Sequence, residues 1–385
     1  MHPVNVPDLS GTRFVVDYGV LASSDGEARQ RAREICYEQT VEFPADLLPP
    51  GDVPDHIVGR LESVEPHGPD RFRVAISYAI EISSFELTQL INVVFGNSSI
   101  KPGLRVERLT LPPVLEDRFR GPRFGRAGLR AALGVAERPL LCTALKPMGL
   151  SATALSEIAY RCALGGIDLI KDDHGLTDQP FAPFRERIQR CAEAVARANH
   201  ETGERSLYVP NLAGPLDTLL ERAHFARSAG AGGLMVSPGL LGLDALRLLA
   251  DDDTLALPML SHPALLGSFV TSANDGLSHF MMFGQLMRLA GADAVIFPNY
   301  GGRFAFSREE CQSISDGTAS PMGHIRPVFP APAGGMSLGS VPGIIEMYGQ
   351  DVIILVGGDL HRHGPDLAAT ARQFRASVTN ARHQA

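Results

Sequence analysis

Residues 165–176 read GGIDLIKDDHGL, in which a short apolar run ends in a lysine, two aspartates and a histidine. Such a run, bounded by glycine and ending in polar residues, is typical of a strand buried on both faces of a parallel sheet. Similar runs recur from residue 139 onward at intervals of roughly 25 to 40 residues. The others are LLCTALKPMG (140–149), SLYVPNLAGP (206–215), GGLMVSPG (232–239), LPMLSHPA (257–264), DAVIFPNYGG (293–302), RPVFPAPAGG (326–335) and VIILVGGDLH (352–361).

The segments between these runs carry apolar residues at helical spacing and end in glycine, as in residues 151–166 and 217–233. Eight strand-then-helix units are typical of a (β/α)8 TIM barrel, which usually needs about 250 residues. The sequence therefore predicts an α/β protein whose residues 126–385 form a carboxyl-terminal (β/α)8 barrel that carries the active site.

Residues 1–125 have a different pattern. Residues 12–20 and 71–80 are predicted as strands, and residues 25–39 and 83–96 as amphipathic helices. This mixture predicts an amino-terminal α+β domain ahead of the barrel.

Composition limits the classes of function. The net charge of -8 argues against a nucleic-acid binder, and 44% hydrophobic with 20% charged residues is typical of a globular protein. No apolar segment predicts a signal peptide or a membrane span, so we expect a cytoplasmic protein that does not enter membranes. The five scattered cysteines predict reduced thiols, and Cys311 is better interpreted as a helix-face thiol than as a reactive one.

Lysine is scarce: only Lys101, Lys146 and Lys171 stand among the 35 basic residues. Where arginine supplies nearly all positive charge, the remaining lysines are candidates for chemistry that needs an amine able to lose its proton. Lys146 and Lys171 follow the first and second predicted strands, on the face where such barrels hold their active sites.

The run from Lys171 to His174 allows two interpretations. One is an ion pair of Lys171 with Asp172 or Asp173 and no metal, which these four residues alone favour. The other is a metal site, which requires that Lys171 stop being a cation, for example by carbamylation with carbon dioxide. The resulting carbamate oxygen would suit Mg²⁺.

Glycine pairs follow the seventh and eighth predicted strands, Gly334-Gly335 and Gly357-Gly358. Backbone amides exposed by such pairs can bind a phosphate group, which in barrels commonly lies at these two loops. The loop after the sixth strand offers further substrate-binding candidates, Asn299 and Arg303, beside a third pair, Gly301-Gly302. His262 ends the fifth strand and is a candidate general acid or base, although a structural histidine is about as consistent with its position.

Several of these motifs together resemble the RuBisCO superfamily, specifically its non-carboxylating branch, the RuBisCO-like proteins. TALKPMGLS (143–151) resembles the lysine motif of the first strand, and GGIDLIKDDHGL resembles the metal-lysine motif. PAPAGGMS (330–337) and LVGGDLHRHG (355–364) resemble the two phosphate loops, and residues 93–113 resemble the end of the family's amino-terminal domain.

The resemblance implies that carbamylated Lys171 and Asp173 hold Mg²⁺ and that Lys146 moves protons or polarises the enolate oxygen. It also implies a homodimer in which the amino-terminal domain of one subunit completes the site of the other, with Glu34 as the acidic residue supplied. The implied substrate is a small phosphorylated sugar.

Four departures from the carboxylase pattern indicate a different reaction. His174 stands where carboxylases have a glutamate ligand, and imidazole would favour Mn²⁺, Fe²⁺ or Zn²⁺ over Mg²⁺, or leave the ion out. The loop after the sixth strand has no lysine, Met148 replaces the second lysine of the first motif, and the segment SHPALL (261–266) has no arginine for a second phosphate. We therefore expect no carboxylase activity and one phosphate site.

The remaining groups can form an enediolate. The leading hypothesis is an isomerase or enolase acting on a ketose phosphate of the 5-methylthioribulose 1-phosphate type, in sulfur salvage. A second is a decarboxylase, or a transcarboxylase/hydrolase, of a 3-oxo sugar-acid phosphate, as in apionate-type catabolism. A third is a sugar-phosphate-binding homologue without catalytic activity.

Overall fold

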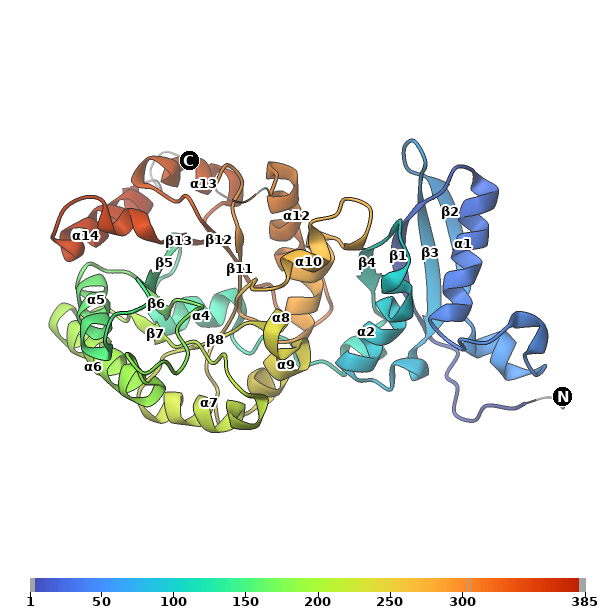
Figure 1. Cartoon of the computed structure of the whole chain (residues 1–385), viewed down its shortest axis with the longest axis horizontal. Helices are drawn as coiled ribbons and strands as arrows, with labels where there is room; N and C mark the ends of the chain where they lie inside the picture. Colours follow the sequence, from blue (N-terminus) through green and yellow to red (C-terminus); the bar gives the residue numbers. More distant parts are fainter. Residues whose placement is uncertain (1–3, 303, 305, 381–385) are drawn as a thin grey trace. The chain divides into compact units, whose positions relative to one another are not determined.

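The computed structural model describes residues 4–302, 304 and 306–380, which fall into two compact units (Figure 1). The first unit contains Met1–Arg120, Leu266–Leu286 and Pro321–Ile325. The second contains Gly121–Leu265, Met287–Ser320 and Arg326–Ala385. The boundary between residues 125 and 126 that the sequence suggested stays a prediction.

The first unit is built on a five-stranded sheet with the order β10-β4-β1-β3-β2. Its neighbouring strands are antiparallel except for β10 and β4, which are parallel. Two longer helices accompany the sheet, so the predicted α+β domain is confirmed. The elements are β1 (Arg13–Leu21), α1 (Asp25–Glu38), β2 (Arg60–Pro66), β3 (Arg71–Ala79), α2 (Leu87–Phe95), β4 (Leu104–Thr110) and β10 (Gly276–Leu277).

Strand β1 shows why this sheet forms. Its residues Phe14, Val16, Tyr18 and Val20 are fully buried, and the residues between them are more exposed apart from Gly19. This is the two-residue period of a sheet with one covered face. The buried hydroxyl of Tyr18 donates to the backbone oxygen of Val94 in α2 at 2.7 Å, so its polar atom is satisfied inside the core.

Strand β10 comes from a part of the chain far from the rest of its sheet. Gly276 pairs with Arg105 and Leu277 with Val106, across about 170 positions of sequence. A strand of two residues has no recognisable apolar pattern, and the sequence did not predict it.

The second unit contains an eight-stranded sheet with the order β7-β6-β5-β13-β12-β11-β9-β8, in which all paired strands are parallel. A parallel bridge between Asn211 and Met235 links the ends of this order, so the sheet is nearly closed into a barrel. All eight predicted strands are confirmed. They are β5 (Leu140–Leu145), β6 (Leu169–Asp172), β7 (Leu207–Val209), β8 (Leu234–Val236), β9 (Met259–Ser261), β11 (Ala294–Pro298), β12 (Phe329–Ala333) and β13 (Ile353–Val356).

Helices surround these strands (Figure 1). Helix α4 (Gly125–Leu133) precedes the first strand, and its Leu129 and Leu133 belong to the same buried cluster as inward-facing strand residues such as Leu140 and Phe329. The other helices of this unit are α5 (Ala152–Leu164), α6 (Phe184–Thr202), α7 (Leu219–Ser228), α8 (Pro238–Leu241), α9 (Leu243–Asp251), α11 (Met287–Leu289), α12 (Arg308–Ala319), α13 (Val341–Tyr348) and α14 (Leu367–Asn380). The remaining helices of four or more residues are α3 (Pro113–Glu116), α10 (Gly267–Val270), three 3-10 helices (Ile80–Ser83, Asn97–Ile100 and Gly358–His361) and two π-helices (Val53–Ile57 and Phe280–Leu286).

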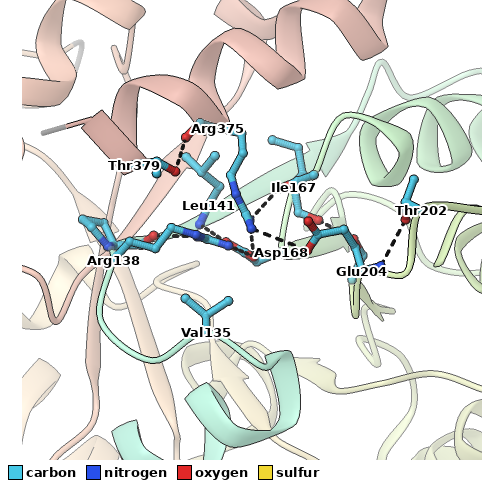
Figure 2. A network of polar contacts seen from close by, with 12 residues as sticks. Val135, Arg138, Leu141, Ile167, Asp168, Thr202, Glu204, Arg375 and Thr379 are labelled. Carbon is cyan, nitrogen blue, oxygen red and sulfur yellow. Dashed lines mark hydrogen bonds and ion pairs between the residues drawn. The ribbon is translucent and has the colours of Figure 1, made fainter. Parts of the chain in front are cut away.

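Buried carboxylates fasten the amino ends of the strands. Asp168, just before β6, accepts two hydrogen bonds from Arg138 at 2.7 and 2.6 Å, one from Arg375 of α14 at 3.0 Å and one from the amide of Leu141 at 2.8 Å (Figure 2). Asp293, just before β11, accepts three backbone amides in a similar way. These contacts join neighbouring strands and helices at the end of the barrel opposite the expected active site.

Candidate active site

Lys146 and Lys171 lie next to each other at the carboxyl ends of adjacent strands. In the parallel register of β5 and β6, Ala144 pairs with Lys171 and Leu145 with Asp172. Lys146 and Asp173 therefore follow as the next neighbours, and the Lys146 Nζ lies 3.2 Å from the Asp173 Oδ1. The structure thus brings both lysines to the face where the sequence placed them.

The amine of Lys171 is buried, with only 2% of the residue exposed. Its Nζ donates a hydrogen bond to the backbone oxygen of Asp172 at 2.9 Å. Burial lowers the pKa of Lys171, although the negative charge of Asp173 works against this shift. A lowered pKa increases the fraction of Lys171 that is a neutral amine, and the neutral amine is the form that can react with carbon dioxide.

Asp173 connects Lys146 with His174. Its Oδ1 lies 3.2 Å from the Lys146 Nζ and 3.4 Å from the His174 Nδ1. Although burial raises the pKa of Asp173, the hydrogen bond with His174 and the charges of Lys146 and Lys171 hold it well below its usual range. Asp173 is therefore a carboxylate at neutral pH.

Two imidazole rings stack beside this carboxylate. The rings of His174 and His262 are 4.5 Å apart between centroids and 11° from parallel. Burial, together with the charges of Lys171 and His174, lowers the pKa of His262 to about 2, so this ring is neutral at physiological pH. The backbone amide of Ala264 donates to the His262 Nδ1 at 3.2 Å, which leaves the ring proton on Nε2. His262 can therefore donate a hydrogen bond without carrying charge.

Asp172 faces away from this group into a buried network. Its carboxylate accepts from the Arg187 Nε at 3.1 Å, from the Tyr208 hydroxyl at 2.8 Å and from the backbone amide of Asn211 at 3.1 Å. Asp172, Arg187 and Asn211 are all fully buried. The ion pair of Lys171 with Asp172 that the sequence left open is not formed, because Arg187 occupies that carboxylate.

Arg187, Tyr208 and Asn211 were missed by reasoning from sequence. The only signal for Asn211 was its place directly after the third strand run, where a polar residue can face the active site. Arg187 lies on helix α6, and helical spacing alone gives no sign that an arginine there points inward.

The predicted phosphate-binding glycines lie on adjacent strands. Ala333 pairs with Leu355 in β12 and β13, so both glycine pairs follow neighbouring strand ends. Gly334 and Gly335 have φ angles of +87° and +77°, a backbone conformation that favours glycine. A Cβ added to Gly357 or Gly358 would meet no atom within 4 Å, so the space beside these backbone groups is open.

The loops after β11 and β12 touch each other. A Cβ added to Gly302 would lie 2.8 Å from the backbone oxygen of Gly334, and one added to Gly335 would lie 3.2 Å from the Cα of Gly302. Asn299 is buried, and its backbone amide donates to the Ala333 oxygen at 2.8 Å. Its Oδ1 accepts from the Tyr348 hydroxyl at 2.7 Å, and its Nδ2 donates to the Tyr300 oxygen at 3.2 Å. Arg303 lies outside the described residues.

Two further predictions concern residues away from the strand ends, and a third concerns membrane spans. Glu34 is an exposed residue of α1 in the first unit, where it accepts from Gln30 at 3.2 Å. Cys311 is buried on α12, and burial raises the pKa of its thiol, which disfavours a reactive thiolate. None of the described helices is long and apolar enough to cross a membrane.

The side chains fit a metal ion only if Lys171 is modified. Within the residues that the structure describes, no three His, Cys, Asp or Glu side chains gather as a metal-binding group. Asp173 and His174 supply two ligand types at the end of β6, and a carbamate on Lys171 would supply the missing anionic oxygen. The donor chemistry therefore fits a divalent cation, with the modification as a condition.

Comparisons with known proteins give the relationship. Residues 125–384 match the family model described as ribulose bisphosphate carboxylase large chain, catalytic domain. The chain is 40% identical over 370 residues to the 5-methylthioribulose-1-phosphate isomerase of Rhodospirillum rubrum, covering 96% of this chain and 97% of the relative. It is 36% identical over 306 residues to the 2,3-diketo-5-methylthiopentyl-1-phosphate enolase of Geobacillus kaustophilus, covering 79% and 74% respectively.

The fold agrees with a solved structure. The crystal structure of a Rubisco-like protein from Rhodopseudomonas palustris superposes with a TM-score of 0.86 at 38% sequence identity, covering 96% of this chain and 98% of that one. Similarity in sequence and in fold thus extends over both units of the chain.

Proposed function

The chain belongs to the RuBisCO large-chain superfamily as a RuBisCO-like protein, and from that premise we propose that it forms an enediolate on a singly phosphorylated ketose without carboxylating it. The observation that carries this proposal is the group formed by Lys146, Lys171, Asp173, His174 and His262 at the strand ends. It combines an amine, a carboxylate and a neutral hydrogen-bond donor, which are the groups that removal of a proton next to a carbonyl requires.

In this reaction Lys146 moves the proton. Its side chain is more than a third exposed, so the amine can reach a bound substrate, and the contact of its Nζ with Asp173 at 3.2 Å orients it. The neutral His262 donates from Nε2 to the oxygen on which negative charge develops.

A divalent cation would be held by carbamylated Lys171, Asp173 and His174, with Mg²⁺ or a metal that accepts imidazole more readily. When bound, such an ion would stabilise the negative charge of the enediolate oxygens. In this proposal the barrel keeps Lys171 buried, and the contacts with Lys146 and His174 keep Asp173 ionised.

The phosphate of the substrate is proposed to bind at Gly334, Gly335, Gly357 and Gly358, since these open backbone segments follow adjacent strands. Asn299 and Arg303 are proposed to complete that side of the site.

The other end of the substrate is proposed to be apolar. Met148 is 51% exposed, and its methyl group lies 2.4 Å from where a Cβ of Gly175 would be, directly after the reactive run. A thioether or alkyl group fits such a surface better than a second phosphate does, because Met148 offers no charge. The lack of lysine in residues 299–307 further supports an activity other than carboxylation.

The test is proton exchange in D2O. Ketose 1-phosphates, including one with a methylthio end, are incubated with the protein, Mg²⁺ and bicarbonate, and NMR follows deuterium incorporation and new isomers. Incorporation that is lost in Lys146→Ala supports the proposal, and its absence across the panel contradicts it.

The same preparation separates the alternatives. Release of carbon dioxide or transfer of a carboxyl group from 3-oxo sugar-acid phosphates would favour the decarboxylase or transcarboxylase/hydrolase, which reaches a similar enolate by breaking a carbon-carbon bond. Binding of sugar phosphates without turnover would favour a non-catalytic homologue.

We also propose a homodimer in which Glu34 of a second copy completes each site. Mixing inactive Glu34→Gln and Lys171→Met proteins would then restore part of the activity, because some hybrid dimers contain one site free of both changes. No recovery in verified hybrid dimers would contradict this arrangement.

Localisation in the cytoplasm stays a prediction.

A further inference from the structure

Two side chains hold the short loop that carries Asp173 and His174: the partly buried Gln179, whose Nε2 donates to the backbone oxygen of Gly175 at 2.7 Å, and the fully buried Asn211. The Nδ2 of Asn211 donates to the backbone oxygens of both His174 and Leu176, at 2.9 and 3.0 Å. The loop also closes on itself through the Leu176 amide and the Asp173 oxygen at 3.0 Å. Two carbonyl groups of one turn therefore depend on one buried amide group.

The orientation of Asn211 is itself fixed. Its Oδ1 accepts from the backbone amide of Ala213 at 3.2 Å, which directs the Nδ2 toward the loop. Its backbone amide donates to the Asp172 Oδ2 at 3.1 Å, and that carboxylate is held by the fully buried Arg187. Because each of these groups has a polar partner and little space to move, the amide cannot rotate without leaving buried polar atoms unpaired.

We propose that Asn211 is a positioning residue for the reaction: by fixing the backbone of residues 174–176 it sets the directions of Asp173 and His174 relative to Lys146 and His262. This inference rests on the proposed function, since it assigns the orientation of the groups used there. Displacement of reacting groups by about 1 Å can lower a rate by about a hundredfold, so a backbone contact outside the reacting group can control it.

The chain offers a matched control at the amino end of strand β7, whereas Asn211 lies beyond its carboxyl end. Asn199 makes two side-chain bonds to Ser206, just before β7, through its Nδ2 at 2.9 Å and its Oδ1 at 2.9 Å. Asn211 lies just after β7. Asn199→Ala and Asn211→Ala therefore remove comparable bracing contacts, one far from the reactive run and one beside it.

We expect Asn211→Ala to lower kcat by about 10-fold to 100-fold, as is typical for residues that orient active-site groups. The KM should change less than about threefold, because the glycine pairs that would bind the phosphate are untouched. Asn199→Ala should leave both constants within about twofold. If Asn211→Ala does not fold, the shorter polar side chain of Asn211→Ser provides the comparison.

A second measurement does not depend on turnover. NMR of protein with ¹³C-labelled histidine, assigned with His174→Gln and His262→Gln, reports the ring-current shifts of the stacked pair. Asn211→Ala should move the signals of His174 and His262, and Asn199→Ala should not. Unchanged signals, or equal losses of kcat in the two asparagine variants, would overturn the inference, as would shifted signals with an unchanged kcat.

If the wild-type protein exchanges no proton on any ketose phosphate, the proposed function fails. The histidine signals then decide by themselves whether Asn211 fixes the loop.

Discussion

The two ends of the barrel use buried carboxylates in different ways. At the amino end, Asp168 is bound by Arg138, Arg375 and the amide of Leu141, which fastens β5, β6 and α14 to one another (Figure 2). At the carboxyl end, Asp172 is bound just as completely by Arg187 and its neighbours, but the next residue, Asp173, contacts Lys146 and His174 through one oxygen.

The difference separates architecture from chemistry. A carboxylate whose oxygens are bound by arginine and backbone amides holds elements together and has little capacity left for a ligand. At the carboxyl end, Lys171 and Asp173 both have a lowered pKa, and the imidazole of His262 is neutral. These groups are not fully bound by arginine and backbone amides, so they can interact with a ligand. We therefore expect changes at the amino end to act on stability and changes at the carboxyl end to act on activity.

The largest effect is expected for Lys171→Met at the carboxyl end. Methionine is similar in size but cannot be carbamylated, so deuterium incorporation should fall by about 10³-fold or more. The melting temperature should hold or rise, because the variant no longer has to bury an amine. Activity near the wild-type level would remove Lys171 from the reaction, and a large fall in melting temperature would assign it a structural role instead.

Asp168→Asn tests the opposite end. Removing one partner of a buried ion pair leaves Arg138 without its carboxylate, so the free energy of unfolding should fall by about 3–5 kcal/mol. Urea denaturation measures this change, and kcat per folded molecule should stay within about twofold. A loss of kcat at unchanged stability would contradict the division between the two ends.

A third test uses pH at the amino end. Burial raises the pKa of Asp293 to about 6, against the effect of the backbone amides that it accepts, whereas an unfolded aspartate titrates near 3.9. Between these values the folded state holds more protons than the unfolded state, so this group's contribution to stability decreases as pH rises from about 4 to about 6.

Asp293→Asn should remove that contribution. The decline in the free energy of unfolding across this window should become shallower by up to about 1.4 kcal/mol per pH unit, measured by urea denaturation at several pH values. An unchanged slope would show that Asp293 is not protonated in the folded protein over this range.

The smallest effect is expected for Met148→Lys at the carboxyl end. A charge in place of the exposed methionine should lower kcat/KM about tenfold for a ketose phosphate with a thioether end and favour one with an anionic end. Met148→Leu keeps an apolar group of similar volume and should preserve the wild-type preference. Equal ratios of kcat/KM in the two variants would show that Met148 does not contact this end of the substrate.

The sequence predicted the barrel well because its strands are buried on both faces. Residues such as Leu140, Leu169 and Ile353 stand in continuous apolar runs that end in glycine or polar residues, and that pattern is local. Strand β10 was missed because two residues carry no pattern, and it exists only through pairing with a distant strand.

The candidate site divides in the same way. Lys146, Lys171 and His262 could be found because each stands at the end of a predicted strand, and strand ends of a parallel barrel share one face. Arg187 could not be found, because the chain places it on a helix and only the packing of α6 turns its guanidinium toward Asp172.

By itself, the sequence determined the order of strands and helices and which residue types reach the reactive face, because periodicity and strand ends are properties of neighbouring residues. Only the tertiary structure decided which partner each charge has: Lys146 rather than Lys171 pairs with Asp173, Arg187 takes Asp172, and His174 stacks on His262. Such pairings depend on distances between segments that are far apart in the chain, and burial of those segments then sets the pKa values on which the chemistry depends.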